Sequence, residues 1–143
     1  MDLRITRLDP TLELPAYKTP GAVAFDLPVR EKTEILPKQI VLVPTGLVVA
    51  IPDGHMLMIT SRSSTPIKKG LMIANGVGTI DRDYCGPNDE VKIQVYNFTD
   101  SPVTLEKGDR IAQALIFKVE RVNLVEGAVT TDQSRGGFGT TGK

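Results

Sequence analysis

Short segments rich in Val, Ile and Leu recur along the chain, and Gly or Pro interrupts them every ten residues or so. Short apolar runs between turn residues are typical of an antiparallel β-sandwich or barrel. The segments that we predict as strands are 3–8, 22–27, 39–43, 47–51, 55–59, 71–74, 77–80, 91–98, 103–105, 110–117 and 121–125. The pattern predicts an all-β fold, a single-domain jelly-roll-like β-sandwich or barrel.

Three of these segments, 39–43, 47–51 and 55–59, are apolar almost without interruption. A strand with one solvated face alternates apolar and polar residues, whereas an unbroken apolar strand is covered on both faces. Either a sandwich core or an interface between subunits could cover them.

The only helical signals lie between Ser64 and Gly70. Ser64 or Thr65 can cap a helix, Pro66 suits its first position, and Gly70 suits the residue after its end. Start and stop signals this close predict a helix of about one turn.

Arg62, Ser63 and Ser64 precede this turn. Backbone N–H groups, hydroxyls and a guanidinium that converge at a helix start form an anion site of the kind that phosphates use. A capped surface turn with a solvated arginine is an equally good interpretation of these residues alone.

An Asn75-Gly76 step separates segments 71–74 and 77–80, and it predicts a tight turn with these segments as the two arms of a β-hairpin. Asp81 and Asp83 follow the second arm, and they would point to the same side if the strand continued. A functional site that uses these carboxylates and a polar loop with two solvated acids would both fit.

A further acid, Asp26, lies between apolar neighbours in segment 22–27. A buried carboxylate needs a partner, a cation or a capped turn, whereas a solvent-facing one needs none. The sequence leaves these two interpretations open.

The hydrophobic pattern ends before residue 130. Residues 130–143 hold mainly Gly, Ser and Thr with Arg135 and Phe138, and they cannot build a core of their own. We therefore predict a β domain over residues 1–129 and a flexible Gly-rich arm over residues 130–143. The arm could close over a ligand through arginine–phosphate pairing and aromatic stacking, or it could be a frayed tail.

Composition narrows the functional classes. The 143 residues suit one domain, and 17 basic residues balance 17 acidic ones, so no net field draws the protein to nucleic acid or to a membrane. The single cysteine, Cys85, and the single histidine, His55, exclude an internal disulfide, a thiolate zinc cage and a multi-histidine zinc centre. No signal peptide or membrane span is recognisable, and we expect a soluble, cytoplasmic protein.

Five motifs, taken in order, resemble those of the trimeric dUTPases. They are residues 24–27 (AFDL), 62–64 (RSS), 78–84 (GTIDRDY, with Asn75 upstream), 108–113 (GDRIAQ) and 136–142 (GGFGTTG). The resemblance implies a homotrimer with shared active sites that hydrolyses dUTP to dUMP and pyrophosphate. Such an activity keeps uracil out of DNA and supplies dUMP for thymidylate synthesis.

The resemblance also implies residue roles. Asp81 would orient and deprotonate the water that attacks the α-phosphorus. Asp26 would hold Mg²⁺ through water. Tyr84 would stack on the deoxyribose, and Phe138 would close over the uracil. The substrate-binding residues would be Arg62, Ser63, Ser64, Asn75, Gly78, Thr79, Ile80, Tyr84, Arg110, Gln113, Arg135, Phe138, Gly139 and Thr140.

Three features depart from the family pattern. Gln133 aligns with the usual arginine of the fifth motif, and Arg135 lies two residues closer to Phe138. Ser64 replaces a glycine, and segment 86–90 is longer than usual.

Two rival functions stay open at this point. The dCTP deaminases share the fold and the Arg-Ser-Ser motif, but they need a glutamate where this chain has Gln94. A trimeric binding or regulatory protein would keep the nucleotide pocket without turnover.

Overall fold

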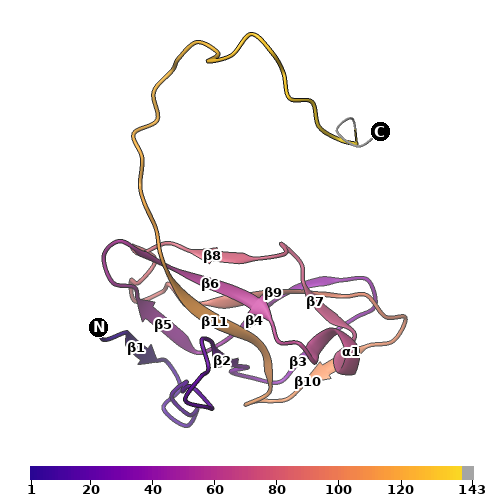
Figure 1. Cartoon of the computed structure of the whole chain (residues 1–143). Coiled ribbons are helices and arrows are strands. Elements are labelled where there is room, and N and C mark those ends of the chain that lie inside the picture. The colour runs from indigo at the N-terminus through magenta and orange to yellow at the C-terminus, as the bar shows by residue number, and fades with distance from the viewer. Residues whose placement is uncertain (140–143) are drawn as a thin grey trace.

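The structure is a computed structural model, and it describes residues 1–139. This part of the chain forms short strands and one short helix (Figure 1). The elements are β1 (Arg4–Arg7), β2 (Phe25–Pro28), β3 (Thr33–Ile35), β4 (Ile40–Pro44), β5 (Leu47–Ala50), β6 (His55–Ser61), α1 (Thr65–Lys69), β7 (Leu71–Ile73), β8 (Gly78–Ile80), β9 (Lys92–Asn97), β10 (Val103–Leu105) and β11 (Arg110–Lys118).

The strands form two main sheets and two strand pairs, all antiparallel. One sheet has the order β2-β11-β6-β8, the other has the order β4-β9-β7, and β1-β5 and β10-β3 are the pairs. The predicted all-β sandwich with one very short helix is confirmed. None of the helices in the described range is long and apolar enough to cross a membrane.

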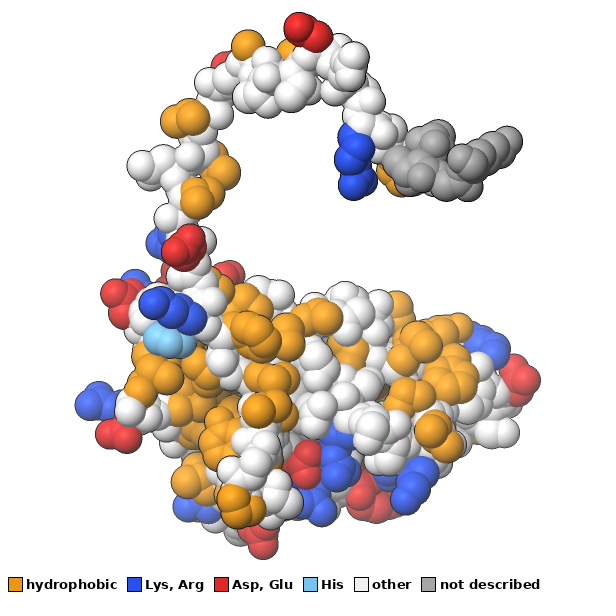
Figure 2. Space-filling model, viewed as in Figure 1, with side chains coloured by type: hydrophobic (Ala, Val, Ile, Leu, Met, Phe, Trp, Pro, Cys, Tyr) orange, Lys and Arg blue, Asp and Glu red, His pale blue; other side chains and the backbone are white. Residues whose placement is uncertain are grey.

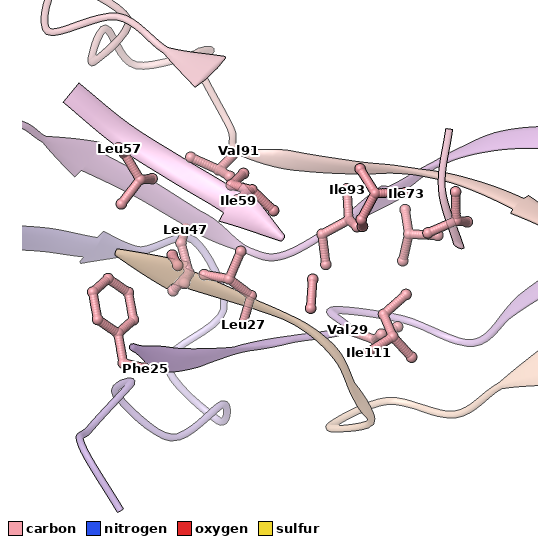
Figure 3. Close-up of a cluster of buried hydrophobic side chains, with 14 of the residues drawn as sticks. Phe25, Leu27, Val29, Leu47, Leu57, Ile59, Ile73, Val91, Ile93 and Ile111 are labelled. Carbon is pink, nitrogen blue, oxygen red and sulfur yellow. The ribbon is translucent and has the colours of Figure 1, made fainter. Parts of the chain in front are cut away.

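Alternation along the strands builds the core. Leu57 and Ile59 of β6 are buried with Ile93 of β9, and they form one cluster with Leu27 of β2 and Ile111 of β11 (Figure 3). Successive strand residues face opposite sides, so one face of each main sheet lies against the core. These aliphatic side chains between the sheets are the main source of hydrophobic stabilisation.

The turn at Asn75-Gly76 forms, but the predicted hairpin is wrong. Gly76 has a φ of 75°, and its N–H donates to the carbonyl of Ile73 at 3.1 Å. However, β7 pairs with β9 and β8 pairs with β6, so the two arms belong to different sheets. The local signal fixes the reversal of the chain, whereas strand pairing depends on which partner each arm meets in the sandwich.

Other boundaries also differ from the prediction. Residues 22–24 lie outside β2, and β3 was not predicted because its three residues carry little apolar pattern. Segment 121–125 is no strand: Val122, Leu124 and Val125 are 72%, 93% and 85% exposed. An apolar run becomes a strand only where another strand pairs with it, and residues 1–139 offer none here.

The unbroken apolar strands behave differently from one another. Residues Leu47–Val49 of β5 are buried, whereas Ile40 and Leu42 of β4 are 58% and 56% exposed. The outer positions of β6, Met56 and Met58, are partly exposed. Core packing within one chain therefore explains only part of this apolar pattern.

Beyond β11 the chain leaves the body. The N–H of Val119 donates to the carbonyl of Gly54 at 2.9 Å, and the following residues arch away from the sandwich (Figure 1).

Hydrophobic side chains gather on the face of the molecule where β6 and β11 lie (Figure 2).

Candidate functional site

An arginine–carboxylate cluster lies where β2, β6 and β11 meet. Nε of Arg62 is 2.8 Å from Oδ1 of Asp26, and NH1 of Arg110 is 3.4 Å from Oδ2 of Asp26. NH1 of Arg62 also donates to the backbone carbonyl of Arg110 at 3.0 Å. The Asp26 side chain is only 13% exposed, so the structure supports the interpretation of Asp26 as a partly buried acid with partners.

Register places a polar row beside this cluster. Gln113 of β11 pairs with Asp26 of β2 on one side and with Thr60 of β6 on the other. Its Nε2 lies 3.4 Å from Oγ1 of Thr60 and 3.4 Å from the carbonyl of Ser61. These long contacts leave the amide of Gln113 available to a ligand.

The short helix α1 follows directly. Ser64 occupies the N-cap position but makes no side-chain cap, and Pro66 is the second helical residue rather than the first. The hydroxyl of Thr65 donates to the carbonyl of Ile111 at 2.7 Å, which ties the helix start to β11. Ser63 is exposed and Ser64 partly exposed, so neither hydroxyl is committed to capping.

The end of the helix is anchored as well. Nζ of Lys69 lies 2.9 Å from Oδ2 of Asp109, in the turn before β11. Partial burial raises the pKa of the Asp109 carboxyl, but Lys69 and the N–H of Glu106 lower it by more, and the net pKa is lowered. Gly70 takes the left-handed conformation that the sequence predicted, with a φ of 64°.

A groove opens beside the cluster. It has a volume of about 580 Å³, and its wall is formed by Asp26, Arg110, Lys107 and the segment from Thr11 to Ala16 with Lys18. Lys107 is held by Asp9, at 2.6 Å, and this contact keeps the pKa of the Asp9 carboxyl well below its usual range. The groove therefore combines free space with a wall that carries both basic and acidic side chains.

A second group of predicted site residues runs from the β7–β8 turn through strand β8 to the turn that follows it. Asn75, Thr79 and Asp81 are exposed or partly exposed, Ile80 is partly exposed, and Gly78 is buried. A Cβ at Gly78 would lie 3.1 Å from Cβ of Ile59, which explains a glycine at this position. Strand β8 ends at Ile80, so Asp81 and Asp83 belong to the following turn.

The two groups lie apart within one chain. Ile80, next to Asp81, pairs with Leu57 near the start of β6, whereas Arg62 lies just beyond the end of that strand. Leu57 and Arg62 are separated by five residues, or roughly 16 Å at about 3.3 Å per residue. One chain does not bring the carboxylate of Asp81 and the guanidinium of Arg62 to the same point.

The third group belongs to the C-terminal arm. Arg135 and Phe138 lie on the exposed arm, which holds them away from the sandwich (Figure 1). Gly139 is the last described residue, and Thr140 lies outside the described residues. The described part of the arm, residues 130–139, arches away from the sandwich that carries the other two groups (Figure 1).

Glu90 was not predicted to have a role from the sequence. Its side chain is buried, and it connects the turn after β4 with Arg30. An acid two residues before strand β9 was the available signal, but its partners lie 44 and 60 residues away in the chain.

The residues around Asp26 can be tested against Mg²⁺. Within residues 1–139 no three His, Cys, Asp or Glu side chains gather into a metal-binding group, and both Asp26 oxygens face arginines. Mg²⁺ keeps several waters and commonly uses one or two carboxylates together with substrate phosphates. Asp26 thus offers a single carboxylate that already pairs with two arginines, and an ion beside it would need water and nucleotide oxygens for its other ligands.

Comparison with known proteins identifies the family. The dUTPase family model matches residues 11–142. The chain belongs to the dUTPase family. It is 42% identical over 142 residues to the deoxyuridine 5'-triphosphate nucleotidohydrolase of Anaeromyxobacter sp. (strain Fw109-5), covering 98% of this chain and 95% of that protein. It is 41% identical to the enzyme of the same name from Hydrogenobaculum sp. (strain Y04AAS1), with 99% of each chain covered.

Solved structures agree in fold. The dUTPase of Streptococcus mutans has a TM-score of 0.78 and 38% identity, over 86% of this chain and 99% of that chain. The dUTPase of Staphylococcus bacteriophage 80alpha, solved with dUPNHPP, has a TM-score of 0.84 over 99% of both chains. At 23% identity, this second similarity supports the fold alone.

Proposed function

We propose that the chain is a dUTP diphosphatase, which hydrolyses dUTP to dUMP and pyrophosphate by attack of water on the α-phosphorus. One observation carries this proposal: the chain, a member of the dUTPase family, has the exposed carboxylate of Asp81 directly after strand β8. Within residues 1–139 this carboxylate has no hydrogen-bond or ion-pair partner, so it is free to act on a ligand.

Asp81 is the general base. Its carboxylate accepts a proton from the attacking water and holds that water in line with the bond to the leaving pyrophosphate. The single histidine, His55, does not compete for this role, because its Nδ1 contacts the carbonyl of Asp53 in an exposed turn.

The arginine cluster binds the triphosphate. Arg62 and Arg110 supply guanidinium groups, Ser63 and Ser64 supply uncommitted hydroxyls, and Gln113 supplies an amide. Charge-assisted hydrogen bonds to phosphate oxygens are about twice as strong as neutral ones. Asp26 holds both arginines in place before the nucleotide arrives.

The β7–β8 turn, strand β8 and Tyr84 recognise the base and the sugar. Asn75 and the backbone of Gly78, Thr79 and Ile80 would present donors and acceptors to the uracil edge, and Tyr84 would stack on the deoxyribose. A site built on such hydrogen bonds rejects a base with the reversed pattern, such as cytosine, by roughly 10⁴-fold.

Mg²⁺ is the proposed cofactor. A mutant dUTPase from phage phi11 of S. aureus coordinates a structural Mg(II) ion. In this chain the ion would partly neutralise the triphosphate, and Asp26 would hold it through water.

A homotrimer with shared active sites is the proposed assembly. The separation between Asp81 and Arg62 supports it, because a second copy must supply one group to complete a site. The apolar side chains of partly exposed Met56, Met58 and Leu115 and of exposed Phe117 offer a surface for that contact. Met56 lies opposite Phe117, and Met58 lies opposite Leu115, across β6 and β11.

The C-terminal arm, residues 130–143, would complete the site by closing over the bound nucleotide. Phe138 would cover the uracil, and Arg135, Gly139 and Thr140 would contact the phosphates. The extended path of residues 119–139 gives the arm the reach to approach a neighbouring copy (Figure 1). We place the enzyme in the cytoplasm, where it would remove dUTP from the nucleotide pool and provide dUMP, with neither nucleic acid nor membrane as a partner.

Release of pyrophosphate by the purified protein tests the function. We expect cleavage of dUTP, and not of dCTP, dTTP or UTP. Asp81→Asn should lower kcat by about 10²- to 10⁴-fold while a non-hydrolysable dUTP analogue still binds. Deamination of dCTP would favour the deaminase, binding without turnover would favour the regulatory protein, and full activity of the variant would remove Asp81 from the mechanism.

A further inference from the structure

The side chain of Tyr84 is held by the far end of its own loop. Its hydroxyl donates to the backbone carbonyl of Glu90 at 3.2 Å, although the residue is 38% exposed. The loop between Ile80 and Lys92 has no strand of its own, so this bond is one of the few that fix the ring. The position of Tyr84 therefore depends on the position of the Glu90 carbonyl.

Glu90 is in turn anchored through its carboxylate. The side chain is only 9% exposed, Oε1 accepts from the N–H of Gly46 at 2.7 Å, and Oε2 pairs with NH1 of Arg30 at 3.0 Å. A carboxylate in this environment is stable only with such partners, because an unpaired buried charge is costly. Gly46 lies in the turn between β4 and β5, and Arg30 lies in the segment between β2 and β3, so the carboxylate joins two separate parts of the chain.

The backbone next to Glu90 is fixed at the same place. Val91 donates to the carbonyl of Leu47 at 2.8 Å, and the hydroxyl of Thr45 donates to the carbonyl of Val91 at 2.6 Å. Gly46 has a φ of 72°, and a Cβ there would lie 3.0 Å from Leu12 and 3.2 Å from Arg30. Leu12 and Arg30 thus lie so close to this turn that a side chain at position 46 would crowd them, which explains the glycine.

The longer segment before Glu90 makes this anchor more important. Oδ2 of Asp89 accepts from the N–H of Gly86 at 2.7 Å and closes residues 86–89 into a compact turn. Within the described part of the chain no strand pairs with this turn, and longer loops have more conformational freedom to lose. The ion pair between Glu90 and Arg30 therefore anchors the end of the loop that accepts the hydrogen bond from Tyr84.

We propose that Glu90, with Arg30 and Gly46, is a positioning residue for Tyr84 and thereby sets the discrimination between deoxyribose and ribose. The inference rests on the proposed function, in which Tyr84 packs on the sugar. Glu90 does not touch the nucleotide. Its side-chain contacts fix the position of the Glu90 backbone carbonyl, which accepts the hydrogen bond from the Tyr84 hydroxyl. The tyrosine ring then occupies the space that a ribose 2′-hydroxyl would need.

The experiment is a double-mutant cycle on substrate selectivity. Tyr84→Phe removes only the hydroxyl, and Glu90→Gln retains an acceptor for Gly46 but turns an amide donor toward Arg30. We expect each variant to lower the ratio of kcat/KM for dUTP over UTP by about tenfold, mainly through a gain on UTP. The double variant should lose no more than the larger single loss, because both act through one contact.

A matched control and a second variant complete the design. Glu106→Gln makes the same chemical change in the pair of Lys32 and Glu106, whose side chains are 68% and 62% exposed, and should leave the ratio unchanged. Arg30→Met removes the cation but keeps an apolar stem, and it should reproduce the effect of Glu90→Gln if that variant folds poorly.

The outcomes separate the inference from the function on which it rests. An equal loss on both substrates, an unchanged ratio, or losses that multiply in the double variant would overturn the role of Glu90 while dUTP hydrolysis stands. Affinities for non-hydrolysable dUTP and UTP analogues give the same ratio without chemistry, so the selectivity can be read even if Asp81 is not the base. A parent protein that neither binds nor cleaves dUTP would refute both proposals.

Discussion

Oδ1 of Asp26 lies 2.8 Å from Nε of Arg62, and this ion pair holds the arginine that follows β6 against the strand β2. Arg110 approaches the other carboxylate oxygen at 3.4 Å. The carboxylate thus neutralises part of two guanidinium charges in a site proposed for a triphosphate. When a nucleotide binds, its phosphates can take over this pairing.

Replacing Asp26 tests that arrangement. Asp26→Asn leaves the two guanidinium groups without a counter-charge, so a nucleotide analogue should bind at least as well without Mg²⁺ as in the parent. Turnover should nevertheless fall by about 10- to 100-fold, and half-maximal activity should need more Mg²⁺, because the water-mediated contact is weakened. Pyrophosphate release measured against Mg²⁺ concentration gives both quantities.

Asp100→Asn is the matched control. Asp100 pairs with Lys38 at 3.0 Å, and its side chain is 93% exposed. An exposed pair contributes little, so rates and Mg²⁺ dependence should equal those of the parent. If Asp26→Asn needs no more Mg²⁺ for half-maximal activity than this control, Asp26 has no role in holding the ion.

Removal of the arm end should affect chemistry and not assembly. A chain that ends at Gln133 lacks Arg135 and Phe138 but keeps the sandwich and the outer face of β6 and β11. We expect turnover of dUTP to fall by at least about 10²-fold, since closing a site contributes mainly to the transition state. Light scattering should find the same oligomer, and unchanged rates would show that the arm has no catalytic role.

Gly70 should tolerate no side chain. Its φ is 64°, and a Cβ would lie 2.0 Å from Cγ2 of Thr99. Gly70→Ala combines backbone strain of about 1–3 kcal/mol with this overlap, and thermal unfolding should show a clear loss of stability. Gly54→Ala is the comparison, because Gly54 has a φ of 68° but open space around it; equal losses would mean that the contact with Thr99 is unimportant.

Acid should weaken the fold in part through Asp109. Its pKa is lowered in the folded protein, so its pairing with Lys69 stabilises the fold above the unfolded pKa and is lost as pH falls through the folded value. Asp109→Asn should cost no more than about 1 kcal/mol near neutral pH, since the pair is about one-third exposed. Its melting temperature should fall less than that of the parent between about pH 5 and pH 3; parallel curves would contradict the assignment.

Local sequence signals were sufficient where one stretch of chain contains both partners of an interaction. Gly70 after a short helix and Asn75-Gly76 at a reversal need only a backbone that accepts positive φ, and both turns form. The alternation of apolar residues in β9 likewise predicts which side chains are buried, because successive strand residues face opposite sides.

Local sequence signals did not predict which distant segments pair with each other. The arms around Asn75-Gly76 pair with β9 and β6 rather than with each other, and Glu90 meets Gly46 and Arg30 from far along the chain. Such contacts depend on which surfaces meet when two sheets pack, and a short segment carries no information on its distant partner.

The order of residue types along the chain determined the β class, the turns and the chemical groups available to a nucleotide, since periodicity and side-chain chemistry are local properties. Only the tertiary structure decided that Asp26 joins Arg62 and Arg110, and that Asp81 lies at the other end of β6. The physical reason is strand register: it fixes which side chains become neighbours across a sheet, and it results from packing of the whole sandwich.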